Sequence, residues 1–157
     1  MQPDLKSEAD TASKERLRLW LRFLKASSTI EATLRENLRQ EFATTLPRFD
    51  VMAALSRYDE GLKMSQLSEV LRVSNGNVTG IVDRLSNDGF LVRVSVPGDR
   101  RASLVRLTKR GQEEFQKQAA AHEIWVNEML SAFSPDAARD ITQRLEQLEA
   151  SLQKEKV

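Results

Sequence analysis

The sequence contains no cysteine and a single histidine, His122. The absence of cysteine excludes disulfides, thiolate metal sites and oxidant sensing through a thiol. One histidine argues against a zinc site built from several histidines. The chain also lacks a nucleophile elbow, a metal-binding motif and a phosphate-binding loop. An enzyme is therefore the least favoured class of function, and neither a metal nor a cofactor is expected.

Long apolar segments are absent as well. There is no run of about 18 apolar residues that would span a bilayer, and the polar N-terminus, Met1–Lys14, lacks the apolar region of a secretory signal. We therefore expect a cytoplasmic protein with no membrane partner. With 157 residues, 40% of them apolar, the chain suits one domain with a real core.

The net charge is only +1, but the charges are unevenly distributed. Between Arg84 and Arg110 the sequence has seven basic and two acidic residues, so this segment carries +5 and the rest of the chain −4. A cationic patch on an acidic body concentrates the electrostatic field where phosphate groups would lie. The alternative is a solvated basic surface without a nucleic-acid partner.

Both ends of the chain carry helical apolar patterns. Residues 1–12 are expected to form a flexible arm, and residues 13–45 an N-terminal dimerisation helix starting near Ser13, because apolar residues recur at spacings of three and four from Leu17 to Phe42. Leu46-Pro47 then starts another helix, with proline in its first turn, where the missing N–H is harmless.

Residues 112–157 are expected to supply two further dimerisation helices. Thr108 is predicted to cap the first, which would run to about Ala132. Ser134-Pro135-Asp136 starts the second with a cap, a proline and an acid. The last helix has an apolar seam at spacings of four, three and four, formed by Ile141, Leu145, Leu148 and Leu152. Such a seam is most simply buried against a second copy, which predicts a two-fold homodimer; the alternative is that these helices fold back on the central domain.

The central segment, residues 46–111, is predicted to hold three helices followed by a hairpin. The first helix should stop near Gly61, and a short one follows. The residues expected to point inward from the short helix are Leu67, Val70 and Leu71. Ser74 has the chemistry of an N-cap for the third helix, and Gly89 suits the left-handed position that ends it. The apolar residues of this third helix share one face: Val78, Ile81, Val82 and Leu85.

Phe90–Val96 and Ala102–Leu107 are rich in β-branched and apolar residues, with the turn sequence Pro97-Gly98-Asp99 between them. They are predicted to pair as a β-hairpin. The sequence as a whole therefore predicts a mainly helical fold with a small β-hairpin, a winged helix-turn-helix core flanked by long dimerisation helices.

The face of the third central helix opposite its apolar residues carries small polar groups. Asparagine can pair with adenine, threonine can contact a base edge, and arginine can grip guanine or phosphate. Gly76 and Gly80 each weaken a helix interior by about 1 kcal/mol relative to alanine, and close approach of the backbone to DNA is one reason to keep them. The alternatives are a tolerated first-turn position for Gly76 and a packing contact cleared by Gly80.

The hairpin tip is cationic, with Arg100 and Arg101 next to Asp99. An acid two residues before Arg101 can orient its guanidinium for a DNA groove; the alternative is an ordinary turn acid with two solvated arginines. The predicted DNA-binding residues are Ser74, Asn75, Gly76, Asn77, Thr79, Gly80, Arg84, Asp99, Arg100 and Arg101.

Five short motifs occur in order along the chain: Leu46-Pro47-x-Phe49-Asp50, Val78-Thr79-x-x-Val82-Asp83-x-Leu85, Gly89-Phe90-Leu91, Asp99-x-Arg101 and Leu107-Thr108-x-x-Gly111. Their order and spacing resemble those of the MarR family of bacterial regulators over about residues 15–150. The resemblance implies a winged-helix dimer on a pseudo-palindromic operator, usually released by a small ligand. It assigns the wing arginine to Arg101 and the recognition-helix contacts to residues 75–79.

Family ligand pockets usually lie between the dimerisation helices and the winged domain. The aromatic and cationic residues that could line such a pocket here are Trp20, Arg22, Phe23, Phe49, His122 and Trp125. Together they would suit an aromatic acid, although core or interface packing is the favoured interpretation for each residue taken singly. Residues 17–22 and 73–80 also resemble a branch that regulates hydroxycinnamate breakdown and responds to aryl-CoA thioesters.

Three classes of function were considered, and the enzyme is the least favoured because the chain lacks catalytic motifs. The favoured one is a ligand-responsive, homodimeric repressor that binds double-stranded DNA. The alternative is a winged-helix module for protein contacts without sequence-specific DNA binding. A steep loss of binding with added salt distinguishes the first from the second.

Overall fold

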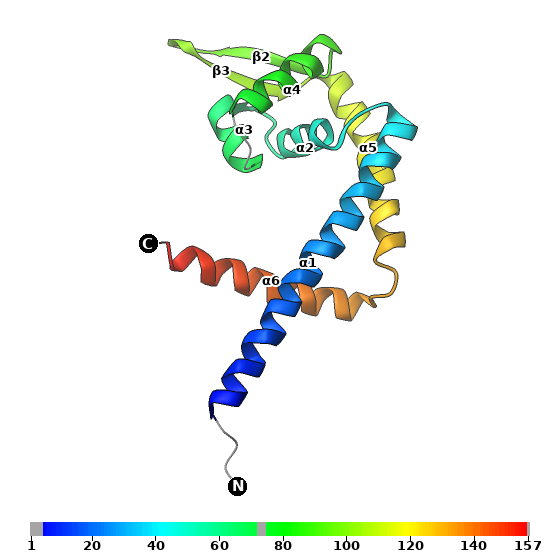
Figure 1. Ribbon diagram of the computed structural model, residues 1–157. Helices are drawn as coiled ribbons and strands as arrows, with labels where there is room; N and C mark the ends of the chain where they lie inside the picture. Colours follow the sequence, from blue (N-terminus) through cyan, green and yellow to red (C-terminus); the bar gives the residue numbers. More distant parts are fainter. Residues whose placement is uncertain (1–4, 72–74, 157) are drawn as a thin grey trace. The chain divides into compact units, whose positions relative to one another are not determined.

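The computed structural model (Figure 1) describes residues 5–71 and 75–156. Its elements in chain order are α1 (Leu5–Phe42), α2 (Leu46–Leu55), β1 (Leu62–Lys63), α3 (Met64–Leu71), α4 (Asn75–Asn87), β2 (Leu91–Val96), β3 (Asp99–Leu107), α5 (Lys109–Met129) and α6 (Pro135–Lys154). The chain divides into two units, Met1–His122 and Glu123–Val157. The first holds the sheet, α1 to α4 and most of α5; the second holds the end of α5 and α6.

The first helix begins at Leu5, so the prediction of a non-helical arm over residues 5–12 is wrong. This stretch has no apolar stripe, but it has local helix-stabilising contacts. Lys14 pairs with Asp10 at 3.1 Å, one turn earlier, and Glu8 lies in the first turn. Such contacts are enough to extend a helix that has already formed, because propagation is far easier than nucleation. Near the other end of α1, Leu34 and Leu38 are buried, and α1 packs on α2.

The start of α2 is as predicted, with Pro47 in the first turn and the Thr45 hydroxyl accepting a hydrogen bond from the N–H of Arg48 at 3.3 Å. The helix ends at Leu55, earlier than the expected end near Gly61. Gly61 instead lies in a turn with φ +94°, and a Cβ there would meet the carbonyl oxygen of Val105 at 2.5 Å. The residue therefore combines a left-handed conformation with close approach to β3.

The hairpin is confirmed and belongs to a three-stranded antiparallel sheet in the order β1-β3-β2. The two-residue strand β1 was not predicted, because it is too short to show a period. It pairs with β3 through Leu62 opposite Val105. β3 starts at Asp99, before the expected Ala102, and its ladder with β2 is irregular at the tip: Ser95 faces Ser103, but Val96 faces Asp99. Residues 100–102 therefore form a bulge beside the turn.

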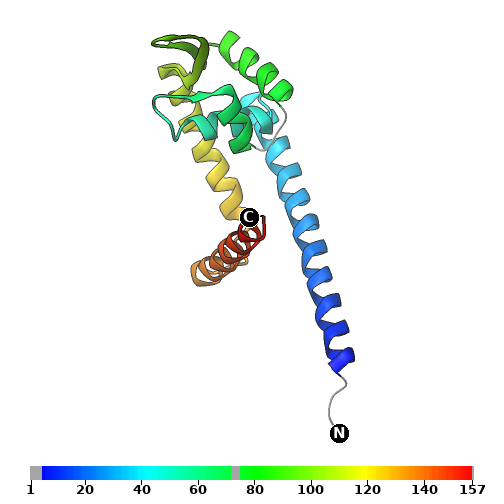
Figure 2. The same ribbon diagram turned by 90° about the vertical axis from the view of Figure 1, so that its left-hand side faces the viewer.

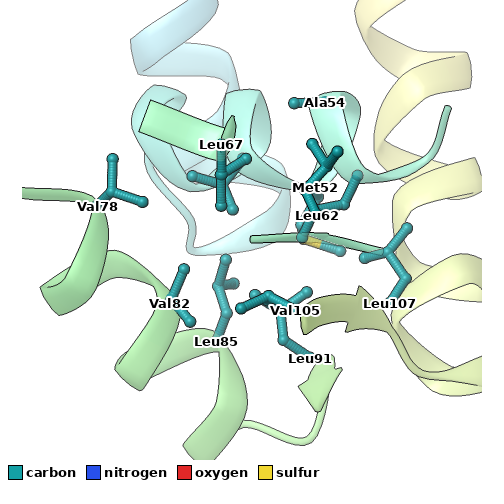
Figure 3. Packing of buried hydrophobic residues seen from close by; sticks show 12 residues of the cluster. Met52, Ala54, Leu62, Leu67, Val78, Val82, Leu85, Leu91, Val105 and Leu107 are labelled. Atoms are coloured by element: carbon teal, nitrogen blue, oxygen red, sulfur yellow. The ribbon is translucent and has the colours of Figure 1, made fainter. Parts of the chain in front are cut away.

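A single apolar core joins α2, α3, α4 and the sheet, and Figure 3 shows the side chains that meet there. The fully buried members include Met52, Leu55, Leu67, Val78, Val82, Leu85 and Val105. Each such side chain stabilises the fold by roughly 1.5–3 kcal/mol relative to exposure. The inward face of α3 was partly mispredicted: Leu67 is buried, but Val70 is 49% exposed. Ser68 takes the inward position, and its hydroxyl donates to the carbonyl of Met64 at 3.1 Å.

The joint between the hairpin and α5 explains two of the sequence motifs. The Thr108 hydroxyl donates to the carbonyl of Gly89 at 2.7 Å and accepts from the N–H of Gly111 at 3.0 Å, so Thr108 caps α5 as predicted. Gly89 has φ +84°, the left-handed conformation expected at the end of α4. A Cβ on Gly111 would lie 2.0 Å from the carbonyl oxygen of Phe90. α5 ends at Met129 rather than near Ala132.

In the second unit, α6 starts where the sequence predicts. The N–H of Ala137 donates to the Ser134 hydroxyl at 3.2 Å, and Pro135 opens the helix. The seam residues are all solvent-exposed in the single chain: Ile141, Leu145, Leu148 and Leu152. Among the described residues, no helix is long and apolar enough to cross a membrane.

Candidate nucleic-acid interface

The apolar side of α4 is fixed by the core, and this leaves its other side open to solvent. Val78, Val82 and Leu85 are buried at spacings of four and three, which defines the inward face. The predicted DNA-contact residues whose side chains are described on this helix are exposed: Asn77, Thr79, Gly80 and Arg84. Ser74 lies outside the described residues; Asn75 and Gly76 form the first turn of α4.

Gly80 lies on the open face of α4, with free space next to its Cα. A Cβ built at this position meets no heavy atom of the described residues within 4 Å. Clearance of a packing contact within the chain therefore does not explain this glycine. The remaining explanation is close approach of an external backbone or surface to α4.

The wing is held against α4 by an ion pair that the sequence did not reveal. The Asp83 carboxylate accepts from the Arg93 guanidinium at 2.5 Å, joining the outer part of α4 to β2. The two partners are ten residues apart in the sequence and lie on different elements. The pairing depends on how α4 packs on β2, and no local sequence pattern encodes that.

At the hairpin tip, Asp99 acts differently from the prediction. Its carboxylate accepts a hydrogen bond from the backbone N–H of Arg101 at 3.0 Å. No ion pair between Asp99 and the Arg101 guanidinium occurs in the described part of the chain. The predicted guanidinium contact is wrong because a carboxylate two residues before an amide closes a local turn more readily than it reaches the end of a long side chain. The exposed guanidinium of Arg101 is left available to an external anion.

The comparisons with known proteins agree with this arrangement. The model of the MarR family matches residues 44–102, which run from the start of α2 to the wing. The chain is 34% identical to the uncharacterized HTH-type transcriptional regulator YkoM of Bacillus subtilis (strain 168), over 69% of each chain. It is 30% identical to the transcriptional activatory protein BadR of Rhodopseudomonas palustris (strain ATCC BAA-98 / CGA009), over 89% of this chain and 79% of that one.

The chain belongs to the MarR family. A MarR family transcriptional regulator from Silicibacter pomeroyi has the same fold, with a TM-score of 0.75 and 33% identity over 90% of this chain and 97% of that chain. Sco3205, a MarR family regulator from Streptomyces coelicolor solved in complex with DNA, shares the fold at 20% identity, with a TM-score of 0.77 over 90% and 89% of the chains. MarR-family proteins are DNA-binding transcriptional regulators and not enzymes.

Of the six residues proposed to line a MarR-type ligand pocket, the structure brings two into contact. The rings of Phe49 and His122 stack at 4.7 Å between centroids, and Phe115 lies 5.6 Å from Phe49. Trp20 and Arg22 are exposed on the N-terminal half of α1, where Phe23 is half-buried. Trp125 is buried and belongs to the second unit.

Two of the cavities formed by the described residues open on the first unit, and neither is lined by any of these six residues. The smaller, about 310 Å³, lies between the end of α2 and the start of α5, next to Tyr58 and Gln112. The larger, about 890 Å³, is a groove along α4 lined by arginines of α1, α2 and α4. Sequence reasoning missed this groove because Arg35 and Arg48 come from separate helices that only the tertiary fold brings to α4.

Proposed function

We propose that the protein is a homodimeric regulator that binds a pseudo-palindromic operator and is released from it by a small organic acid or its thioester. The main support for DNA binding is the open side of α4, where Gly80 is unobstructed and the arginine-tipped hairpin lies next to the helix. A helix of this width fits the major groove, about 12 Å across, while a cationic hairpin reaches phosphate or the adjacent minor groove.

Exposed apolar seams support the homodimer. The seam on α6 stays exposed in the single chain, and so do Leu17, Leu21 and Leu24 on the N-terminal half of α1. Monomers seldom keep such long apolar stripes in water. A second copy that covers them by two-fold symmetry would present two reading helices to two half-sites about 10 bp apart, centre to centre.

The effector is proposed to be an aromatic acid or an aryl-CoA thioester, acting in the cytoplasm. Support comes from the resemblance of residues 17–22 and 73–80 to regulators of hydroxycinnamate breakdown. A chain without cysteine also has no thiol with which to sense oxidants. Repression is proposed as the mode, although BadR, at 30% identity, is named as a transcriptional activatory protein.

Three measurements test the proposal. Duplexes selected from a random library by the purified protein should share a two-fold sequence, and footprinting should protect two half-sites. A panel of aromatic acids and aryl-CoA thioesters should contain a compound that weakens binding. Transcription from a promoter that contains the selected site should fall when the protein is added. Absence of any duplex binding at low ionic strength would refute DNA reading and favour a module for protein contacts.

A further inference from the structure

The groove along α4 is bordered by three helices. Its walls are the C-terminal end of α1, the N-terminal end of α2 and one side of α4, and its volume is about 890 Å³. Four arginines line it: Arg35, Arg39, Arg48 and Arg84. The α4 side is formed by residues spaced three and four apart, Asn77, Gly80, Ile81 and Arg84, so a single helical stripe faces the groove.

Glu36 is the only acidic side chain among the described residues that line the groove, and Arg39 neutralises it. The Arg39 guanidinium donates to both carboxylate oxygens of Glu36, at 3.0 and 2.6 Å. This hydrogen bonding lowers the pKa of Glu36 below its ordinary value, so the carboxylate is ionised and occupied by its partner. Arg35, Arg48 and Arg84 form no ion pair with any residue that the structure describes. The groove therefore carries uncompensated positive charge.

The start of α2 adds to this charge. Thr44, Thr45 and Pro47 line the same groove, so the N-terminal end of the helix lies at its wall. The aligned peptide dipoles of a helix place about half a positive charge at this end. The arginines and the helix end act in the same direction and favour an anion.

The groove lies on one flank of α4, and the wing lies on the other. Asp83 reaches β2 through Arg93, whereas Gly80 and Arg84 turn toward α1. Figure 2 shows α4 between the hairpin and the upper end of α1. An α-helix with its side chains is about 10–12 Å wide and fills a major groove of about 12 Å. The two phosphate backbones must then run along the two flanks of the helix.

We propose that Arg35 and Arg48, together with Arg84, bind the phosphodiester backbone of the duplex on the flank of α4 away from the wing. The inference rests on the proposed reading of DNA by α4. It adds a second phosphate-binding wall, the arginine-lined side of the groove, on the flank of α4 opposite the wing. A small anionic effector is the competing occupant. The groove favours the duplex because it opens on the same exposed side as α4, and Arg35 and Arg84 are themselves solvent-exposed. A pocket for a small molecule would bury its anchoring groups more completely.

The first test measures the salt dependence of binding for wild type, Arg35→Ala, Arg48→Ala and the double variant. Two probes are used, a duplex selected by the wild-type protein and an unrelated duplex. Each lost phosphate contact should reduce the slope of log K against log salt by about 0.9. Affinity should fall on both probes, and the preference between them should stay unchanged, because phosphate carries no sequence information. Arg57→Ala is the matched control: this exposed arginine lies beyond the other end of α2, about 15 Å along the helix.

A second variant should change binding in the opposite direction, which loss of folding would not produce. Glu36→Gln removes the acid and frees Arg39. Binding to both duplexes should strengthen at low salt, and the salt slope should steepen by up to about 0.9. Circular dichroism of each variant verifies that the fold is intact.

The outcomes separate this inference from the proposed function. Wild-type protein that binds neither duplex overturns both. Wild-type binding with unchanged slopes in the arginine variants and in Glu36→Gln overturns only the second phosphate wall. If those variants keep wild-type DNA binding but lose release by an anionic compound, the groove is an effector site and the proposal is wrong. Reduced slopes in the arginine variants with a steeper slope in Glu36→Gln support it.

Discussion

The carboxylate of Asp83 lies 2.5 Å from the guanidinium of Arg93, and this ion pair ties α4 to β2. Both side chains are about half exposed, so the pair contributes only about 0–1 kcal/mol to the free energy of unfolding. Its main effect is electrostatic. Asp83 is the only acidic residue of α4, and pairing with Arg93 masks a negative charge that would otherwise oppose DNA.

Asp83→Asn should therefore strengthen binding to duplexes of any sequence at low salt, because it removes a negative charge and frees Arg93 for phosphate. The slope of log K against log salt should steepen by about 0.9. Fluorescence anisotropy with an unrelated duplex measures this, and Arg93→Gln should act in the opposite direction. Weaker binding by Asp83→Asn would mean instead that orientation of α4 by the ion pair outweighs its charge.

The wing should contribute mainly to DNA affinity, whereas α4 should determine which bases are preferred. Arg101→Ala should weaken binding to selected and unrelated duplexes nearly equally, since its guanidinium is expected to meet phosphate or groove shape. Thr79→Ala or Asn75→Ala should change the preferred base at one position, by about 1–3 kcal/mol. Competition binding against a set of single-base operator variants makes the comparison. A change of base preference in Arg101→Ala alone would transfer the reading function from α4 to the wing.

Several local features were predictable because their causes are local. Thr108, Ser134 and Pro47 mark helix starts through hydrogen bonds or ring geometry that involve only neighbouring residues. The hairpin follows from β-branched runs on either side of Pro97-Gly98. The apolar spacing of α4 defines its open side without knowledge of its partners.

The remaining features depend on contacts between distant segments. The strand β1 exists because Leu62 pairs with Val105, and two residues carry no periodic signal. Val70 was expected inward because it is apolar, but the core selects the helical face that contains Leu67 and Ser68. The groove of Arg35 and Arg48 requires α1, α2 and α4 to be placed together first.

Two glycines should respond to alanine in opposite ways. In Gly111→Ala the new Cβ would lie 2.0 Å from the Phe90 carbonyl oxygen, so the joint between the hairpin and α5 must shift. We expect a loss of more than about 2 kcal/mol in the free energy of unfolding. Gly80→Ala has free space and should stabilise the isolated protein by up to about 1 kcal/mol through helix propensity. Urea unfolding measures both changes.

Gly80→Ala should at the same time weaken operator binding, because the added methyl group separates α4 from the DNA. Stabilisation with unchanged DNA affinity would contradict close approach at this position. A folded Gly111→Ala protein of wild-type stability would contradict the geometry of the joint.

The α6 seam should control the oligomeric state. Leu145→Glu and Leu148→Glu place charges on the apolar stripe, and a buried unpaired charge costs several kcal/mol. Sedimentation velocity should then find a monomer where wild type forms a dimer, and footprinting should shrink to one half-site. Gln143→Glu, on the opposite side of the helix, is the matched control and should remain dimeric. Equal masses for wild type and both leucine variants would refute a dimer through α6.

A pH dependence of stability should arise at Asp50, beside the Phe49–His122 stack. Although Asp50 is exposed to solvent, partial desolvation of its carboxyl by the neighbouring residues raises its pKa above the ordinary value of 3.8; the charge of His122 opposes the rise, and Glu31 adds to it. A carboxyl whose pKa is higher in the folded than in the unfolded chain binds more protons when folded. Its stabilising contribution is complete below the unfolded pKa and is lost as the pH rises through the folded pKa.

Asparagine has no proton to lose, so Asp50→Asn should gain stability relative to wild type as the pH rises from below 3.8 to neutral. Urea unfolding of both proteins across this range gives the difference directly. Glu31→Gln removes the repulsive charge and should reduce the dependence without abolishing it, since desolvation is the larger cause. A difference between Asp50→Asn and wild type that stays constant or falls with rising pH would show that desolvation does not control this carboxyl, and that attraction to His122 does.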